Sequence, residues 1–353
     1  MAKPYFLAKL TYNCFMVVNK QSVASGFDQP NGSGPFKMVE YKKDQVIRLA
    51  RNNDYYNGKP RLAKVNILLG ASASEPLTLY EKGSIDFTFI GGTAVERGLD
   101  KNSPLNKELF SKPQLDLTYV AFNNTLKPFD DAKVRQAFSL VVDRSRIARA
   151  MFENKVVQAA TILPPGIPGY TGNPGELVYD VNRARDLIAQ SSYRSAANLP
   201  KITLYSSDSQ LAGVLKDVYN KTFGIDILVR QPDYKDFLSG LSARQFQVYS
   251  STWVADYPDP ENFLRVLLGT DSTINSVGYS NSKFDDLLKQ ADQLSDPVKR
   301  LEAYGKAEQI ALSDAPLLPI SHSISYLLVK SYVKGLDLTP SGIISLKDVY
   351  IVR

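Results

Sequence analysis

The sequence has little of what most metalloproteins and hydrolases need. It contains one cysteine, Cys14, and one histidine, His322, among 353 residues. A single cysteine excludes an intrachain disulfide and any zinc site built from several cysteines, and a single histidine excludes a site with several histidine ligands. Cys14 begins the apolar run of residues 14–18, which predicts a buried structural thiol. We therefore expect no cofactor and no metal ligand.

Long apolar runs and segregated charge are also absent. No apolar stretch approaches the length that spans a bilayer, and Pro4 stands where a signal peptide would begin its apolar segment. A secreted protein in its mature form would look the same. The 42 basic residues are interleaved with 36 acidic ones, giving a net charge of +6. This pattern predicts a solvated surface and no nucleic-acid partner.

Motifs for nucleophilic and phosphate chemistry are missing too. There is no G-x-S-x-G elbow and no glycine-rich phosphate loop, since the glycine stretch of residues 32–35 ends in proline. His322 lies in a predicted strand, where an ordinary polar or partly buried histidine is expected. A hydrolase that uses His322, with or without Cys14, stays open as a rival. The abundant aromatic residues, 20 tyrosines and 16 phenylalanines, are instead typical of a binding protein.

The order of periodic segments predicts an α/β fold. Strands are expected at 36–41, 46–51, 64–69, 85–90, 115–122, 201–205, 225–230, 246–252, 317–321, 325–329 and 349–352. Helices are expected at 73–82, 131–153, 181–190, 210–223, 234–243, 282–294 and 297–314. The strands and helices alternate between residues 201 and 243, which predicts a parallel sheet in the second half of the chain.

The segment from Trp253 to Phe263 carries the most information about function. It contains the only tryptophan, and Asp256 stands between aromatic residues just before a proline-rich turn. A carboxylate framed by aromatic rings suits the capture of a cation such as a ligand's amino group. The alternative is the start of a helix, with Asp256 or Asp259 as N-cap and Pro260 in its first turn. These residues alone leave both interpretations open.

Several motifs, in order along the chain, resemble those of the extracytoplasmic solute-binding proteins of ABC importers, the oligopeptide and dipeptide family (family 5). The resemblance runs from Pro4 to Arg353. The matching segments are G-S-G-P-F-K at 32–37, R-N-N-D-Y-Y at 51–56, G-S-I-D at 83–86, F-N-N at 122–124, P-F-D-D at 128–131, V-R-Q-A-F-S at 134–139, D-R at 143–144 and W-V-A-D-Y at 253–257.

This resemblance implies a two-lobed periplasmic-binding-protein fold (class II) and a set of ligand contacts. Asp256 would pair with the α-ammonium group of a peptide, and the backbones of Thr252 and Val254 would pair with it as a strand. Pockets beside the peptide would be shaped by Trp253 and Tyr257. The remaining expected contacts are Tyr119 and Ser250. Some relatives carry an arginine at the position of Ser250, so the partner of the ligand's carboxylate is open.

The resemblance also implies an organisation into lobes. Residues 1–120 with 320–353 would form the remnant of lobe I, and residues 121–319 the C-terminal ligand-binding lobe, with hinges near 118–124 and 319–323. Relatives carry a further segment before the position of Pro4, so an N-terminally truncated chain is expected. Such a chain would expose a sheet edge and would bind peptides weakly or not at all unless the missing segment is supplied. Micromolar or tighter peptide binding by residues 1–353 alone in calorimetry would overturn this expectation.

The expected function is therefore capture of an extracellular peptide and its delivery to the permease subunits of an ABC importer, without catalysis. The location would be periplasmic, or extracellular and membrane-associated. Rival ligands within the same fold are a sugar, an opine or a metal chelate. Replacing Asp256 with asparagine should abolish the binding of a free-amine peptide and leave a hydrolase unaffected.

Overall fold

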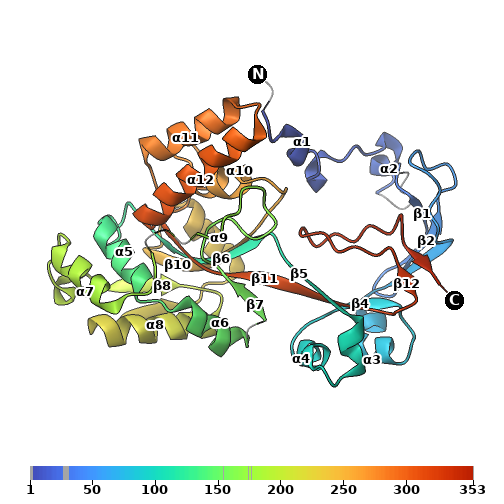
Figure 1. Ribbon diagram of the computed structural model, residues 1–353, viewed down its shortest axis with the longest axis horizontal. Helices are drawn as coiled ribbons and strands as arrows, with labels where there is room; N and C mark the ends of the chain where they lie inside the picture. Colours follow the sequence, from blue (N-terminus) through green and yellow to red (C-terminus); the bar gives the residue numbers. More distant parts are fainter. Residues whose placement is uncertain (1–2, 27–31, 154, 174, 176, 353) are drawn as a thin grey trace. The chain divides into compact units, whose positions relative to one another are not determined.

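The computed structural model describes residues 3–26, 32–153, 155–173, 175 and 177–352. By their internal contacts, the residues form two compact units (Figure 1). Unit 1 comprises Met1–Tyr12 and Pro113–Ser323, and unit 2 comprises Asn13–Lys112 and Ile324–Arg353. Both units combine strands and helices, which confirms the predicted α/β class.

Unit 1 contains most of the helices. Its helices are α1 (Phe6–Lys9), α5 (Ala132–Leu140), α6 (Arg144–Phe152), α7 (Val181–Gln190), α8 (Ser209–Phe223), α9 (Tyr234–Ser242), α10 (Glu261–Leu268), α11 (Ser282–Gln293), α12 (Pro297–Asp314) and the 3-10 turn η4 (Ala196–Asn198). Its strands are β6 (Asp116–Phe122), β7 (Val156–Gln158), β8 (Ile202–Tyr205), β9 (Ile227–Arg230), β10 (Val248–Val254) and the first part of β11 (Leu317–Val329).

The strands of unit 1 lie in the order β11-β6-β10-β8-β9. β8 is parallel to both β9 and β10, as the sequence predicts, whereas β10 pairs antiparallel with β6 along its whole length. β6 in turn pairs antiparallel with β11. β10 is therefore a central strand whose two sides have partners of opposite direction and different length.

Helices cover both faces of this sheet. Alternate residues of β6 face opposite ways, so that Tyr119 joins one core and Val120 the other. The first core is completed by α9–α12 and the second by α5–α8, and Figure 1 shows α10–α12 opposite α5, α7 and α8. Because both faces are buried, β6 is a nearly continuous apolar run.

Unit 2 is built around two small sheets and a long strand. Its helices are α2 (Lys20–Ala24), α3 (Pro76–Glu81), α4 (Thr93–Leu99) and the 3-10 turns η1 (Asn13–Phe15), η2 (Gly70–Ala73) and η3 (Pro104–Glu108). Its strands are β1 (Phe36–Lys42), β2 (Val46–Arg51), β3 (Lys64–Leu68), β4 (Phe87–Ile90), β5 (Leu109–Pro113), β12 (Val333–Lys334), β13 (Tyr350–Ile351) and the rest of β11. The first two predicted strands pair as an antiparallel hairpin.

The predicted helix of residues 131–153 is wrong, because the chain forms two helices there. α5 ends at Leu140 and α6 begins at Arg144. Asp143 lies between them with extended backbone, and its side chain accepts the N–H of Arg146 at 3.0 Å and the hydroxyl of Ser145 at 2.7 Å. An aspartate in the middle of an apolar periodicity therefore acts as an N-cap and starts a new helix.

Two further predictions differ from the structure. The strands expected at 317–321 and 325–329 are one continuous strand, β11, since residues 321–323 also pair with β7. Cys14 is exposed rather than buried. The run Phe15–Val18 that follows it is exposed as well, so these apolar residues form no core within the described part of unit 2.

Two arginines from the sequence motifs at 134–139 and 143–144 fix neighbouring loops through hydrogen bonds to backbone carbonyls. Arg135 is buried on α5 and donates to the backbone carbonyls of Phe129 at 2.7 Å and Asp314 at 3.0 Å. Arg144 is buried at the start of α6 and donates to the carbonyl of Leu177 at 2.7 Å. Guanidinium groups suit this task because several donors leave one planar group.

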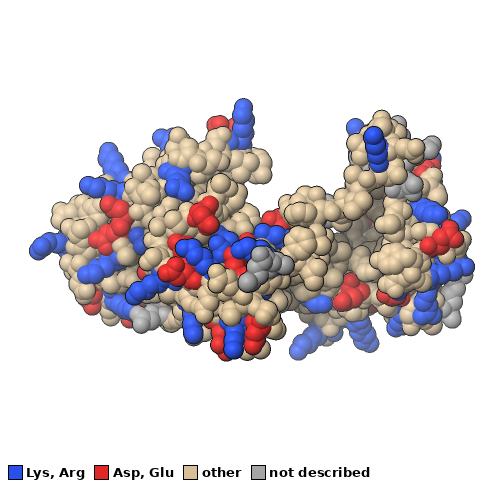
Figure 2. All heavy atoms as spheres, turned by 90° about the horizontal axis from the view of Figure 1, so that it is seen from above, with Lys and Arg blue, Asp and Glu red and all other residues tan. Residues whose placement is uncertain are grey.

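The surface charge of both units is mixed. Figure 2 shows basic and acidic side chains interleaved on the visible face of each unit. Among the described residues, no helix is both long enough and apolar enough to span a membrane.

Glu308 is the most unusual titratable group of the unit 1 core. It lies buried on α12, where its Oε1 accepts the N–H of Leu163 at 2.8 Å. Its Oε2 has no hydrogen-bond partner among the described residues. Burial raises the pKa of Glu308 to about 7, although the N–H groups of Leu163 and Ile162 act in the opposite direction. The folded protein therefore holds this proton more tightly than the unfolded chain does.

We predict that Glu308 makes folding less favourable as the pH rises. Because its pKa is raised on folding from the ordinary 4.5 to about 7, its penalty should grow through this window and level off above it, reaching about 3 kcal/mol. The free energy of unfolding, measured by chemical denaturation from about pH 5 to about pH 8, should fall in the wild type because of this penalty. In Glu308→Gln this contribution to the fall should be absent. Glu302→Gln, on the exposed side of the same helix, should follow the wild type. Parallel pH profiles of Glu308→Gln and the wild type would contradict the prediction.

Candidate functional site

The carboxyl ends of three strands meet at one edge of unit 1. β8 is parallel to β9 and β10, so Tyr205, Arg230 and the end of β10 point toward the same edge. In open α/β sheets, ligands bind in crevices at this edge, because the strands end there and loops take over. A hollow of about 710 Å³ is found here, lined by Tyr205, Val229, Arg230, Gln231 and Pro232.

The second half of β10 has a free edge on the side of β8. β8 pairs only with Val248 and Tyr249, because it ends at Tyr205. On the other side, the bonds from Asn123 N–H to the Gln247 carbonyl and from Ala255 N–H to the Leu115 carbonyl show which residues face β6.

Hydrogen bonding alternates along an antiparallel pair. The odd-numbered residues of β10 therefore bond to β6, and the backbone groups of Thr252 and Val254 point toward the free edge. No backbone hydrogen bond to Thr252 or Val254 on that side occurs among the described residues. Both side chains are exposed, and the hydroxyl of Thr252 lies 2.9 Å from that of Thr118 on β6.

Asp256 lies just beyond this edge and is held by a buried asparagine. The side-chain oxygen of Asn262 accepts the N–H of Asp256 and the indole N–H of Trp253, each at 3.1 Å. The Asn262 amide also donates to Oδ2 of Asp256 at 3.4 Å. Asn262 is fully buried, whereas Asp256 and Trp253 are half-buried. One amide on α10 thus orients both side chains that the sequence singles out.

The carboxylate of Asp256 has no cationic partner among the described residues. It also does not cap α10. The N-cap of α10 is Pro260, which offers no side-chain hydrogen bond. Asp259, just before it, accepts the N–H of Glu261 with its Oδ1 at 3.0 Å and pairs with Arg300 at 2.6 Å. Neither acid that the sequence offers as a helix cap is the N-cap of α10, but Asp259 is engaged within the fold, whereas Asp256 has no cationic partner among the described residues.

Tyr257 is buried and bonds to α10. Its hydroxyl donates to Glu261, which also pairs with Lys9 at 3.4 Å. Burial, followed by the bond to Glu261, raises the pKa of Tyr257 well above its usual value. The ammonium of Lys9 lies 4.6 Å from the ring centroid of Tyr5. Tyr257 therefore anchors the N-terminal residues of unit 1 to α10.

The other two predicted contacts are interior residues of the sheet. Ser250 is buried, and its hydroxyl donates to the hydroxyl of Ser206 at 2.6 Å, just past the end of β8. Tyr119 is buried on β6, and its ring packs edge-to-face on Tyr249 at 6.4 Å. Burial raises the pKa of Tyr119 to about 12. The structure thus gathers four of the predicted residues at the exposed end of β10: Thr252, Trp253, Val254 and Asp256. The other three, Ser250, Tyr119 and Tyr257, are buried.

Sequence reasoning missed two residues of this region. Asn262 lies in the first turn of α10, after the proline-rich turn, and asparagine at such a position is usually solvated. Arg230 ends a predicted strand without any motif around it. Only the register of β9 on β8 brings Arg230 beside Tyr205.

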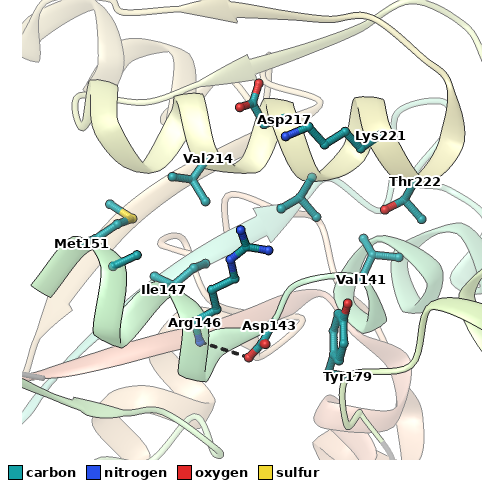
Figure 3. Close-up of a pocket in the computed structure, with 12 residues that line it drawn as sticks. Val141, Asp143, Arg146, Ile147, Met151, Tyr179, Val214, Asp217, Lys221 and Thr222 are labelled. Atoms are coloured by element: carbon teal, nitrogen blue, oxygen red, sulfur yellow. Dashed lines mark hydrogen bonds between the residues drawn. The ribbon is translucent and has the colours of Figure 1, made fainter. Parts of the chain in front are cut away.

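A separate hollow of about 320 Å³ lies between α6 and α8 (Figure 3). Apolar side chains from both helices form part of its wall, and Arg146 points into it. Its charged lining consists of two basic and two acidic side chains, Arg146, Lys221, Asp143 and Asp217. These charges cancel, and none of the site residues predicted from the sequence lines this hollow.

His322 has no access to solvent. It is fully buried, and its Nδ1 donates to the carbonyl of Asp116 at 2.7 Å. Burial lowers the pKa of His322 to about 4, against the effect of that hydrogen bond. A neutral, enclosed imidazole has the surroundings of a core residue and not those of a general base in a cleft.

Comparison with known proteins gives a family match. Residues 2–275 match the family model described as bacterial extracellular solute-binding proteins, family 5 Middle. The chain is 28% identical over 321 residues to Heme-binding protein A of Haemophilus influenzae, covering 89% of this chain and 58% of that protein. It is 26% identical over 328 residues to the dipeptide-binding protein DppE of Bacillus subtilis, covering 90% and 59%.

The chain thus spans less than two thirds of the length of these two relatives. Among solved structures, HbpA2 from Haemophilus parasuis matches with a TM-score of 0.86 at 22% identity, covering 100% of this chain and 72% of that one. These findings confirm the resemblance and the predicted fold.

We predict that Asn262→Ala loosens the whole region. Removing a buried amide that serves Trp253 and Asp256 leaves polar groups without partners and should lower the free energy of unfolding by about 2 kcal/mol. Since Trp253 is the only tryptophan, its emission should shift to the red in the same variant. Urea denaturation followed by fluorescence measures both. Asn198→Ala, which removes an exposed amide bonded to the Tyr193 carbonyl, is the matched control. Equal behaviour of the two variants would count against a positioning role for Asn262.

Proposed function

Because the chain belongs to the bacterial extracellular solute-binding proteins of family 5, we propose that it captures an extended peptide outside the cytoplasm and delivers it to the permease of an ABC importer. The proposal places the peptide on the free edge of β10 and its α-ammonium group on Asp256. No chemical step on the ligand is involved. Since the chain spans under two thirds of its relatives, this function is proposed for the protein to which the 353 residues contribute.

The observation that carries the proposal is the free edge of β10 with an unpaired carboxylate directly after it. The backbone groups of Thr252 and Val254 can pair with a peptide added as a further strand. Such main-chain hydrogen bonds form whatever the ligand's side chains are. They therefore suit a transporter that accepts many sequences.

Asp256 recognises the amino end of the peptide ligand. A charge-assisted hydrogen bond between an ammonium group and a carboxylate is about twice as strong as a neutral one. Asn262 already orients the carboxylate through Oδ2, so little ordering is required when the ligand arrives. The half-buried ring of Trp253 lies next to it and can contact the ligand's first residue.

The name of the Haemophilus influenzae relative supports a second candidate, a haem-like metal chelate. A haem iron takes a protein ligand such as histidine, cysteine, methionine or tyrosine. His322 is enclosed in the core of unit 1, so it is not free to bind iron. The free β10 edge favours a peptide, and hemin serves as the competing ligand in the test below.

We predict that Asp256→Asn removes the preference for a free amino end. Native mass spectrometry uses the whole protein to which these residues contribute, called the wild type here, with pools of random-sequence tripeptides as free amines and as N-acetyl derivatives. The wild type should retain the free amines about tenfold better. Asp256→Asn should bring this ratio close to one, because an amide cannot neutralise the ammonium group. Asp186→Asn, on the exposed side of α7, should behave as the wild type.

The same measurement can refute the proposal. If the wild type holds neither tripeptide pool, or holds hemin in preference to both, the ligand is not a peptide. If Asp256→Asn keeps the full preference for free amines, peptide binding does not use this carboxylate.

A further inference from the structure

We propose that Arg230 binds the carboxylate end of the peptide, so that the site selects short peptides with a free carboxyl group. This inference rests on the proposed function, since it takes the peptide to lie on the free edge of β10. It identifies the group that meets the second charge of the ligand.

The direction of the ligand follows from the position of Asp256. This residue comes after the last residue of β10, Val254. A peptide with its ammonium group at Asp256 must therefore run antiparallel to β10, back toward Tyr249. Its carboxyl end then approaches the end of β8.

The length of the ligand follows from where β8 stops. Tyr205, the last residue of β8, pairs with Tyr249, and the Ser206 hydroxyl touches that of Ser250. The open part of the edge is therefore about five residues long, or about 17 Å. A peptide that continues the row of β8 has room for about two to four residues before it meets this strand.

Arg230 stands beside the place where such a peptide ends. β9 terminates at Arg230, which pairs with Tyr205 in register. Neighbouring strands lie about 4.8 Å apart, so Arg230 is one strand spacing from the row that the peptide would continue. Paired residues share a sheet face, and Tyr205 packs against the same core as Tyr249 and Trp253. The 710 Å³ hollow is lined by both Tyr205 and Arg230.

The charge of Arg230 is available, in contrast to the charges of Arg265 and Arg300. Arg265 pairs with Asp292 at 3.0 Å and Arg300 with Asp259 at 2.6 Å, both within the fold. Arg230 is exposed and forms no ion pair among the described residues. Its guanidinium can bind both oxygens of a carboxylate at once.

Ser250 does not supply this charge. It is neutral, buried and bonded to Ser206. Arg230 lies two strands from Ser250 and one strand spacing from the row that the peptide would continue. The chain thus carries its carboxylate-binding cation on β9 and its ammonium-binding acid after β10, at opposite ends of one short free edge.

The test compares pools of random-sequence tripeptides as free acids and as C-terminal amides, again by native mass spectrometry. The wild type should retain the acids about tenfold better than the amides. Arg230→Gln should bring this ratio close to one and leave the preference for free amines over N-acetyl peptides unchanged. Arg230→Lys should keep part of the ratio, and Arg185→Gln, on the exposed side of α7, should keep all of it.

Each other outcome overturns the inference in a distinguishable way. A full acid preference in Arg230→Gln would show that another group binds the carboxylate. Equal retention of acids and amides by the wild type, with free amines still preferred, would leave the proposed function standing and remove the role of Arg230. Failure of the wild type to hold any tripeptide would remove both.

Discussion

The unequal pairing of β10 is the constraint on which the rest of the site depends. β6 pairs with all seven residues of this strand, whereas β8 pairs with only two. The long partner satisfies the backbone groups of β10 on one side, and the short partner leaves backbone donors and acceptors open on the other. An open edge in the middle of a covered sheet is normally an aggregation hazard. Here it is short and ends at a charged residue, so it suits a short guest strand.

Beneath this edge, the described residues form a buried network of ion pairs and hydrogen bonds. Asp259 with Arg300 and Arg265 with Asp292 tie α10 to α11 and α12. Buried pairs of this kind add little net stability, because desolvating both charges costs about as much as their attraction returns. Their geometric effect is greater, since α10 carries Asn262 and hence determines where Asp256 points. This arrangement preorganises the carboxylate before any ligand binds.

Most elements follow from local sequence signals. Helix α7 begins after Asp180 as predicted, and α12 has the bounds that its proline and aspartate indicate. The predictions of secondary structure are wrong where the same residues are compatible with two local structures. Asp143 fits an apolar periodicity but caps a new helix, and the polar residues in the middle of β11 suggest a break that pairing with β7 bridges. Cys14 lies in an apolar run that nothing in the described part of unit 2 buries.

By itself, the sequence determined the α/β class and the parallel strands of the second half. It also indicated the segment from Trp253 to Phe263 as a candidate ligand site. It could not say which of Asp256 and Asp259 the fold engages in an internal ion pair, because both residues have the same chemistry and lie in one turn. Only the tertiary structure decided this, by pairing Asp259 with Arg300, which is 41 residues away, and leaving Asp256 open. The same holds for Arg230, whose place beside the free edge is a matter of strand register. Register depends on contacts between distant residues, so no local pattern reveals it.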